Sequence, residues 1–287
     1  MGILELYCGI GGAAVAFRDI AQVALAVDID RTALAVYQKN FPAHTTRVAE
    51  LESFLIPRLR QDLWWLSPPC LPYSRRGWQQ DFQDTRSRSL MSIMNQIPEQ
   101  NPRAIVIENV PPFAESESGQ HIQRCLSDAG YDVSIELRCP TELGWPMRRQ
   151  RCYLLASRDG LRSLAPIVIE QQSLRSFLDA DPDETLAVPL SLLKRYCDAV
   201  DIVNEADDHA VAACFGSSYG KSPVRSGSYL RQADGLVRYF SPHEILRLMG
   251  FPCEFSFIDN LSRRRAWALV GNSVSVPVVR WVISRII

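Results

Sequence analysis

The sequence predicts an α/β protein built on a mostly parallel sheet with helices on both faces. Short apolar runs alternate with amphipathic runs up to about Arg158 of the 287-residue chain. Such alternation is typical of parallel sheets, because each crossover between strands carries a helix. The pattern weakens after Arg158 and returns near residue 238. We therefore expect a main domain over 1–158, a small inserted domain over 159–237 and a segment over 238–287 that returns to the main domain.

The elements of the main domain follow in order along the chain. Strands are expected at 2–8, 23–29, 62–67, 103–109, 131–138 and 151–158, with helices at 12–20, 31–40, 87–97 and 119–129. The second helix ends at Phe41-Pro42, because a proline disfavours helical backbone in the residue before it. The fourth ends at Gly130, a residue suited to a left-handed cap.

The returning segment carries a strong helix signature. Ser241 is a predicted N-cap, Pro242 takes the first helical position, and Glu244 completes a capping box. Gly250 and Pro252 end this helix. The apolar run over 275–287 is predicted to be a final helix packed on the sheet.

Composition narrows the class of protein. The net charge is −1, so the chain as a whole lacks the excess of positive charge that is typical of nucleic-acid-binding proteins. However, 28 of its 31 basic residues are arginines, whose side chains suit contacts with phosphates and bases. The absence of an apolar stretch of about 18 residues argues against a membrane span. No signal peptide is evident, so we expect a cytoplasmic protein. The eight cysteines form no C-x-x-C pair, so neither a metal site nor disulfides are expected.

A glycine-rich turn follows the first strand and suits a cofactor. Gly9, Gly11 and Ala14 fit the pattern G-x-G-x-x-G/A, and Asp28 and Asp30 follow about 20 residues later, where an acid binds ribose hydroxyls. This pattern fits a nicotinamide dehydrogenase as well as an S-adenosylmethionine enzyme. A tight strand–helix turn with solvated acids is a further interpretation.

Four polar residues follow or begin the later strands. Cys70 follows two prolines at the end of one strand, Glu108 lies at the end of the next, and Arg149 and Arg151 have the spacing that puts both side chains on one face of a strand. A thiolate that adds to carbon 6 of cytosine makes carbon 5 nucleophilic, and a carboxylic acid assists by protonating N3. Each residue also has a structural interpretation. The thiol could be a loop residue without a chemical role, the acid could pair with an arginine at the edge of the sheet, and the arginines could lie on a solvated strand face.

The order of these stretches resembles the carbon-5 cytosine methyltransferase family. The similar segments are "ELYCGIGG", "SPPCLPYS", "ENV", "MRRQR" and "GNSV", although Leu71 and Met147 stand where the family usually has Gln. The resemblance implies a Rossmann-like fold, S-adenosylmethionine as cofactor with S-adenosylhomocysteine as product, no metal, Cys70 as nucleophile, Glu108 as the N3 acid, and base contacts from Arg149 and Arg151.

The resemblance also implies two sets of binding residues. Cofactor binding is expected of Tyr7 (near the adenine), Gly9, Gly11, Asp28 (on the ribose), Ile29, Glu50 (facing the adenine amine), Pro69, Asn272 and Ser273. Substrate binding is expected of Ser74, Arg75, Arg76, Asn109, Cys214, Phe215 and Tyr219. Phosphate contacts are expected of Arg75, Arg76, Arg86, Arg88 and the run 263–265.

One stretch indicates a branch of the family. "CFGSSYGKSPVRSGSYL", from Cys214 to Leu230, is similar to a segment of the tRNA-methylating branch, with Gly216 in place of the usual Thr. That branch methylates cytosine-38 in the tRNA anticodon loop. Bases in this loop are already partly unstacked, so extruding one costs little free energy. We therefore expect a monomeric tRNA methyltransferase with at most weak DNA binding and no membrane partner. A DNA cytosine methyltransferase and a non-catalytic RNA-binding protein remain the alternatives.

Overall fold

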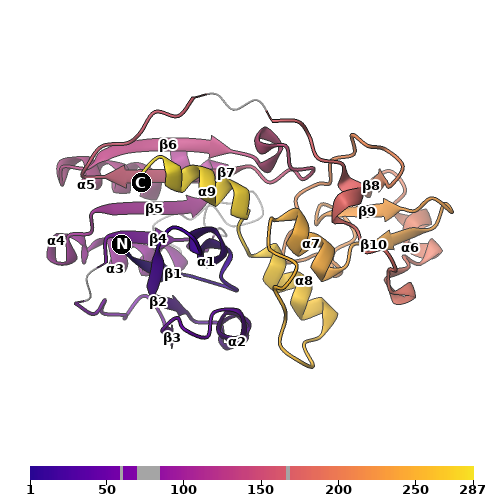
Figure 1. The fold of residues 1–287 in the computed structure, drawn as a ribbon, viewed down its shortest axis with the longest axis horizontal. Coiled ribbons are helices and arrows are strands. Elements are labelled where there is room, and N and C mark those ends of the chain that lie inside the picture. Colours follow the sequence, from indigo (N-terminus) through magenta and orange to yellow (C-terminus); the bar gives the residue numbers. More distant parts are fainter. Residues whose placement is uncertain (59–60, 70–84, 166–168) are drawn as a thin grey trace. The chain divides into compact units, whose positions relative to one another are not determined.

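The computed structural model describes residues 1–58, 61–69, 85–165 and 169–287. The chain forms two compact units (Figure 1). Unit 1 comprises residues 1–138, 150–165 and 279–287, and unit 2 comprises residues 139–149 and 166–278.

A seven-stranded sheet forms the centre of unit 1, with strand order β3-β2-β1-β4-β5-β7-β6. Its strands are β1 (Gly2–Leu6), β2 (Gln22–Asp28), β3 (Thr46–Val48), β4 (Leu63–Leu66), β5 (Ala104–Asn109), β6 (Asp132–Arg138) and β7 (Arg151–Ser157). The first five pair in parallel, whereas β7 runs antiparallel to both β5 and β6. No α-helix lies between β6 and β7, so the chain returns antiparallel. The predicted α/β fold with a mostly parallel sheet is confirmed.

Helices of unit 1 follow its parallel strands, and a final helix ends the chain. They are α1 (Gly12–Phe17), α2 (Arg31–Asn40), α3 (Thr85–Met94), α4 (Ile97–Gln100), α5 (Glu117–Asp128) and the later part of α9 (Val276–Ser284). The Asp30 side chain caps α2 and the Ser116 side chain caps α5. The helix predicted over 87–97 is two helices, α3 and α4. The sequence also missed β3, because its three residues form no apolar run.

Strand burial explains the apolar runs. All residues of β4 and β5 are buried, as expected of central strands covered on both faces. On one face, Trp64 packs in a core with Leu66 and Ile107. Because side chains alternate along a strand, Trp65 lies on the opposite face, where the Phe17 ring of α1 contacts it edge-on.

Unit 2 is built on a three-stranded sheet with order β10-β9-β8. Its elements are α6 (Leu190–Arg195), β8 (Asp201–Asn204), β9 (Ser228–Arg231), β10 (Val237–Tyr239), α7 (Pro242–Leu248) and α8 (Arg263–Gly271), with short 3-10 turns at Pro140–Leu143, Leu174–Phe177 and Glu184–Leu186. The predicted capping box is present: the Ser241 hydroxyl accepts from the Glu244 N–H at 3.1 Å, and the Glu244 carboxyl accepts from the Ser241 N–H at 2.7 Å.

Unit 2 extends further along the chain than the expected 159–237. It includes residues up to 278, because aromatic side chains of this later segment pack against it. The Trp267 ring of α8 contacts Tyr219 and Tyr239, each with ring centres 5.3 Å apart. Its indole N–H donates to the Phe240 carbonyl at 2.9 Å. Gly220, with φ +73°, packs so closely on Trp267 that a Cβ would lie 2.3 Å from the ring.

One stretch of the described residues, Arg263–Ser284, is long and apolar enough by composition to span a membrane. It comprises α8 and α9, and 72% of its most apolar window is buried inside the protein. Core helices show the same pattern.

Candidate active site

The glycine-rich turn lies at the carboxyl edge of the unit 1 sheet. Directly after β1, the Cys8 N–H donates to the Val27 carbonyl of β2, and the Gly11 N–H closes the turn on the Cys8 carbonyl at 2.9 Å. Tyr7 and Gly9 both have positive φ, at 56° and 54°. The chain thus turns sharply between β1 and α1 at the edge where open α/β sheets bind ligands.

The two glycines of the turn are required for different reasons. A Cβ on Gly9 would have nothing within 4 Å, so this part of the backbone borders open space. A Cβ on Gly11 would lie 2.8 Å from the Phe41 ring and 2.9 Å from the Tyr37 ring. Gly9 therefore leaves room for a ligand, whereas Gly11 permits close packing against α2.

Asp28 and Asp30 also have separate roles. One Asp28 carboxyl oxygen accepts from the Gly9 N–H and the other from the Asp30 N–H, both at 2.8 Å. Burial raises the pKa of Asp28, although these hydrogen bonds act in the opposite direction. The Asp30 carboxyl accepts from Thr32 and Ala33 as the α2 cap. Asp28 is therefore the acid that borders the turn.

Other residues predicted to bind the cofactor follow neighbouring strands. Ile29 is 66% exposed directly after β2, and the exposed Glu50 follows β3. Pro69 is exposed after β4. The Tyr7 hydroxyl donates to Ser89 of α3 at 2.8 Å, which fixes its ring near the turn. In unit 2, Asn272 is the exposed C-cap of α8 and Ser273 is buried.

Glu108 and Arg151 form an ion pair where β5 ends and β7 begins. Nε of Arg151 lies 3.3 Å from Oε1 of Glu108, and Glu108 is 7% exposed. The neighbouring Asn109, at 2% exposure, donates from its side-chain amide to the Pro68 carbonyl at 3.2 Å. This bond ties the end of β5 to the segment after β4. Asn109 thus fixes the chain that leads into Cys70.

Cys70, the predicted nucleophile, lies outside the described residues, as do the predicted substrate residues Ser74, Arg75 and Arg76. The last residue described before them is Pro69. Because β4 and β5 are parallel neighbours, Pro69 and Glu108 both lie at the carboxyl edge.

Arg149 differs from Arg151 in its surroundings, and the expected pairing on one strand face is wrong. β7 begins at Arg151, so Arg149 precedes the strand and belongs to unit 2. Its buried guanidinium donates to the carbonyls of Phe215 at 3.0 Å, Gly271 at 3.1 Å and Ser273, and lies 3.5 Å from the Cys214 sulfur. Arg149 therefore joins three segments of unit 2.

Two residues predicted to bind substrate lie in the core of unit 2. Phe215 and Tyr219 are each 1% exposed, and their rings pack edge to face with centres 5.0 Å apart. The Tyr219 hydroxyl donates to the Ser228 carbonyl and accepts from the Phe240 N–H. Both side chains thus shape the segment around the half-buried Cys214 rather than offering a free surface.

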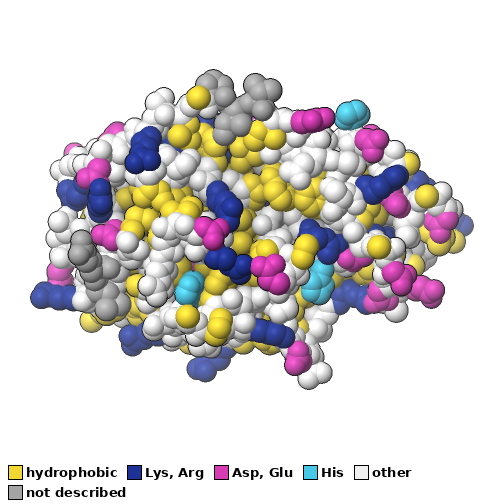
Figure 2. Space-filling model, viewed as in Figure 1, with side chains coloured by type: hydrophobic (Ala, Val, Ile, Leu, Met, Phe, Trp, Pro, Cys, Tyr) yellow, Lys and Arg dark blue, Asp and Glu magenta, His cyan; other side chains and the backbone are white. Residues whose placement is uncertain are grey.

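The predicted phosphate-binding arginines differ in availability. Arg88 and Arg264 are exposed, whereas the Arg263 guanidinium bonds to Asp183 at 2.5 Å and to the Thr185 hydroxyl at 2.6 Å. The side chain of Arg86 lies outside the described residues. On the face seen in Figure 2, basic side chains are interspersed with acidic ones, in keeping with the net charge of −1. The described residues of this face therefore form no uniformly basic surface.

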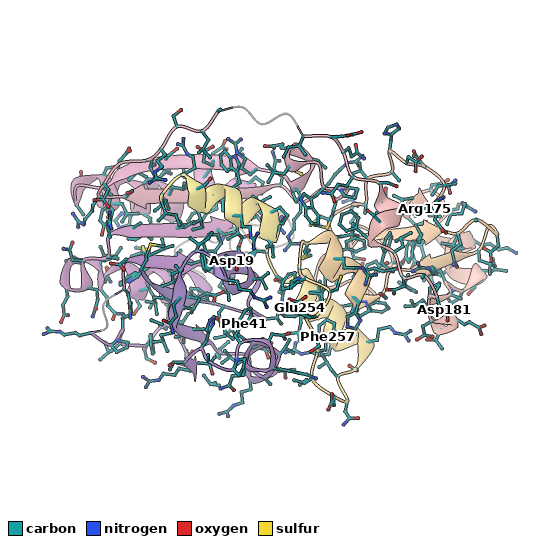
Figure 3. All side chains as sticks on the ribbon, viewed as in Figure 1. Asp19, Phe41, Arg175, Asp181, Glu254 and Phe257 are labelled. Carbon is teal, nitrogen blue, oxygen red and sulfur yellow. The ribbon has the colours of Figure 1, made fainter. Side chains whose placement is uncertain are left out.

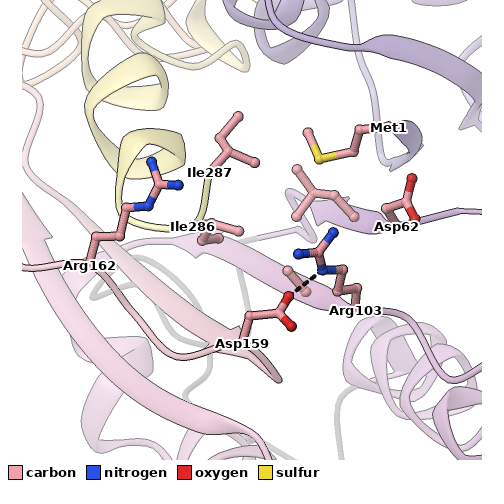
Figure 4. A pocket seen from close by; sticks show the side chains of 9 residues that line it. Met1, Asp62, Arg103, Asp159, Arg162, Ile286 and Ile287 are labelled. Atoms are coloured by element: carbon pink, nitrogen blue, oxygen red, sulfur yellow. Dashed lines mark hydrogen bonds and ion pairs between the residues drawn. The ribbon is translucent and has the colours of Figure 1, made fainter.

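A cavity of about 210 Å³ lies at the other end of the sheet (Figure 4). Its lining includes Met1, Leu63 and Ala104, which stand at the amino ends of β1, β4 and β5, and the Arg103–Asp159 ion pair. The parallel strands separate this cavity from the glycine-rich turn. It is therefore not part of the candidate site.

Glu108 is the acid that the family resemblance predicts, and in that role Glu108→Gln should lower kcat by a hundredfold or more, because general acid catalysis contributes about 10²–10⁴-fold. A glutamine keeps the size of the side chain and its contact with Arg151 but cannot donate the carboxyl proton. The measurement is methyl transfer at saturating cofactor, with the exposed Glu115→Gln as control. A kcat within twofold of the parent would exclude Glu108 as the acid.

The sequence did not indicate that Glu5 contributes to the site region. Glu5 is 1% exposed and accepts a hydrogen bond from Tyr37, whose ring contacts Gly11. The available signal was an acid inside the apolar run "GILELYC". Buried carboxyl groups are rare unless they are paired, so an acid in a central strand indicates a specific partner.

Known proteins with similar sequences or folds indicate the family of this chain. The family model described as C-5 cytosine-specific DNA methylase matches residues 1–189 and 217–287. The tRNA (cytosine(38)-C(5))-methyltransferases of Schizosaccharomyces pombe and Homo sapiens are each 29% identical, and the matches cover 98% and 96% of this chain and 95% and 96% of those proteins. A solved Entamoeba histolytica methyltransferase, EhMeth, superposes with a TM-score of 0.91 at 27% identity, covering 99% of this chain and 97% of that one.

Proposed function

The chain belongs to the C-5 cytosine-specific DNA methylase family, and from this premise we propose that it methylates carbon 5 of cytosine-38 in a tRNA anticodon loop. The observation that carries the chemistry is the Glu108–Arg151 pair at the carboxyl edge of β5, tied through Asn109 to the segment that leads into Cys70. The substrate rests on the 29% identical relatives that act on that tRNA position and on the segment from Cys214 to Leu230.

Each catalytic side chain has one task in this proposal. The Cys70 thiolate adds to carbon 6 of the extruded cytosine while the Glu108 carboxyl gives its proton to N3. Arg151 holds the Glu108 carboxyl in place and contacts the base. After carbon 5 has gained the methyl group, with S-adenosylhomocysteine as the other product, a base removes the carbon 5 proton. The Cys70–carbon 6 bond then breaks, which restores the thiolate, and N3 returns its proton to Glu108. Arg149 acts indirectly, by joining the segments around Cys214 and Ser273.

The residues at the turn fit S-adenosylmethionine, which supplies an electrophilic methyl group when it is bound. The open space at Gly9 admits a ligand against the backbone. The Asp28 carboxyl, whose two oxygens accept from Gly9 and Asp30, has lone pairs left for ribose hydroxyls. Ile29, Glu50 and Pro69 are exposed around the same edge. We assign the adenosine part of the cofactor to these residues, with Tyr7 near the adenine.

A tRNA substrate suits the size of unit 2. Its sheet has three strands of three or four residues, which offer little surface for reading several base pairs in a major groove. An anticodon loop presents bases that are already partly unstacked, so extruding the target costs less than from a duplex. The family description names DNA, and DNA methylation is therefore the second candidate.

Methyl transfer from labelled S-adenosylmethionine to total tRNA and to duplex DNA tests the proposal, with Cys70→Ala as the blank. We expect label in tRNA alone and, by bisulfite sequencing, at position 38. Label in DNA alone would overturn the substrate. No label in either, with no adduct on RNA containing 5-fluorocytosine, would favour a non-catalytic RNA-binding protein.

The proposal includes three further expectations: that the protein acts as a monomer, that it is cytoplasmic, and that duplex DNA is at most a weak ligand. Light scattering of the purified protein with and without tRNA checks the first. Competition by duplex DNA in the tRNA assay checks the third.

A further inference from the structure

A hydrogen-bonded chain of three side chains lies next to the glycine-rich turn of unit 1. The Tyr37 hydroxyl donates to Oε2 of Glu5 at 2.9 Å and lies 3.0 Å from Nδ1 of His44. Glu5 and Tyr37 are fully buried, whereas His44 is half-buried. The Glu5 carboxyl also accepts a hydrogen bond from the Ala14 backbone N–H. One carboxyl on β1 is thereby bonded to both α1 and α2, the helices that flank the turn.

The rings of this chain support the turn itself. The Tyr37 and Phe41 rings lie so close to Gly11 that a Cβ there would meet both at under 3.0 Å. The two rings contact each other with centres 5.0 Å apart, and His44 stacks on Phe41 at the same distance. The Tyr37 hydroxyl therefore fixes a ring that in turn fixes Gly11, while Gly9 stays open to a ligand.

The chain reaches the surface at His44. A cavity of about 370 Å³ is lined there by Ala14, Arg18, Asp19, Phe41 and His44 among others, and Figure 3 labels Asp19 and Phe41. Glu5 lies in the interior, with Asp28 and Cys8 as its charged or titratable neighbours besides Tyr37. The three side chains thus connect a buried acid to a solvent-accessible imidazole.

We propose that Glu5, Tyr37 and His44 are positioning residues for the cofactor, which hold the glycine-rich turn in the conformation that accepts S-adenosylmethionine. The inference rests on the proposed function for the identity of the cofactor. None of the three contacts it; they act through Gly11 and through the Ala14 N–H at the start of α1.

The protonation of Glu5 gives this role a distinctive pH dependence. Burial raises the pKa of Glu5 to about 8, although the bonds from Tyr37 and Ala14 act against burial and nearby Asp28 adds to it. The unfolded chain releases this proton near its ordinary value of 4.5. The folded state therefore loses stability as pH rises from 4.5 through 8. Above pH 8 the Glu5 carboxylate repels Asp28, which holds Gly9, and cofactor affinity should fall.

Tyr37→Phe tests the positioning role, since it keeps the ring against Gly11 and removes only the hydroxyl. We expect the Kd for S-adenosylmethionine, measured by calorimetry, to rise about fivefold, the equivalent of one lost hydrogen bond. At saturating cofactor, kcat should stay close to the parent value. The matched control is Tyr131→Phe, whose hydroxyl donates to the Pro102 carbonyl at 2.6 Å elsewhere in unit 1. Equal Kd values for parent and Tyr37→Phe would overturn the inference.

Glu5→Gln tests the pH dependence, because an amide keeps an acceptor for Tyr37 and Ala14 but does not ionise. Urea unfolding without cofactor at pH 5 and pH 9 should show a loss of stability at the higher pH for the parent and a clearly smaller loss for Glu5→Gln. Equal losses would contradict the role of Glu5.

The outcomes separate this inference from the proposed function. If the parent binds S-adenosylmethionine but methylates no RNA, the substrate is wrong, and a raised Kd in Tyr37→Phe still supports positioning. If the parent binds no S-adenosylmethionine, the identity of the cofactor is wrong, and hydrogen exchange of the amides of residues 9–14 tests whether the three side chains hold the turn. Faster exchange in Tyr37→Phe than in Tyr131→Phe supports that part of the inference, and equal rates overturn it.

Discussion

Cys70→Ala is expected to abolish methyl transfer while cofactor binding stays within about twofold of the parent. The thiolate is the only group in the proposed mechanism that forms a bond to carbon 6, and without that bond carbon 5 of cytosine is too electron-poor to take a methyl group. Apart from Pro69, which follows β4, the cofactor residues assigned in unit 1 follow β1, β2 and β3, and the change at Cys70 leaves all of them in place. For this variant we therefore expect measured turnover to be lost and the calorimetric Kd for S-adenosylmethionine to stay near the parent value.

The chain supplies its own controls for this experiment. Cys125 on α5 and Cys253 after α7 are exposed and unpaired by disulfides. Alanine at either position should leave turnover near the parent level. Appreciable turnover in Cys70→Ala, or a similar loss in Cys125→Ala, would refute Cys70 as the nucleophile.

Glu244→Ala is expected to destabilise the protein by about 3–5 kcal/mol, the cost of breaking a buried ion pair and leaving one partner uncompensated. The fully buried Glu244 carboxyl accepts hydrogen bonds from the two terminal guanidinium nitrogens of Arg238, at 2.7 and 2.8 Å. It also accepts from the backbone N–H groups of Asp179 at 2.9 Å and Ser241 at 2.7 Å. Its removal leaves the Arg238 charge buried in unit 2. Urea unfolding followed by tryptophan fluorescence measures the loss.

The control is an ion pair of similar length at the surface. Arg58 and Glu99 lie 2.7 Å apart, with side chains 83% and 63% exposed. Water solvates both partners once the pair is broken, so Glu99→Ala should cost far less stability than Glu244→Ala. Similar losses for Glu244→Ala and Glu99→Ala would show that the Arg238–Glu244 pair does not stabilise unit 2.

The sequence was sufficient for the parts of this protein that depend on local pattern and strand direction. Apolar runs of the right length predicted the strands, and Ser241 with Glu244 predicted the start of α7. The glycine turn, Asp28 and Glu108 could be placed at one edge because parallel strands all end on the same side of a sheet. The order of these segments along the chain also carried the family resemblance.

Only the tertiary structure decided which side chains act together. Arg149 and Arg151 are two residues apart, yet one bonds to carbonyls in unit 2, including that of Gly271, 122 residues away, and the other pairs with Glu108 in unit 1. Glu5 and Tyr37 are separated by 32 residues, and nothing in their spacing indicates that they meet. The spacing of residues determines the relative directions of their side chains within one helix or strand. The burial of those side chains and the residues they contact depend on how distant segments of the chain pack. The residues proposed for the chemistry could therefore be named from the sequence, whereas the contacts that support the glycine-rich turn could be found only in the fold.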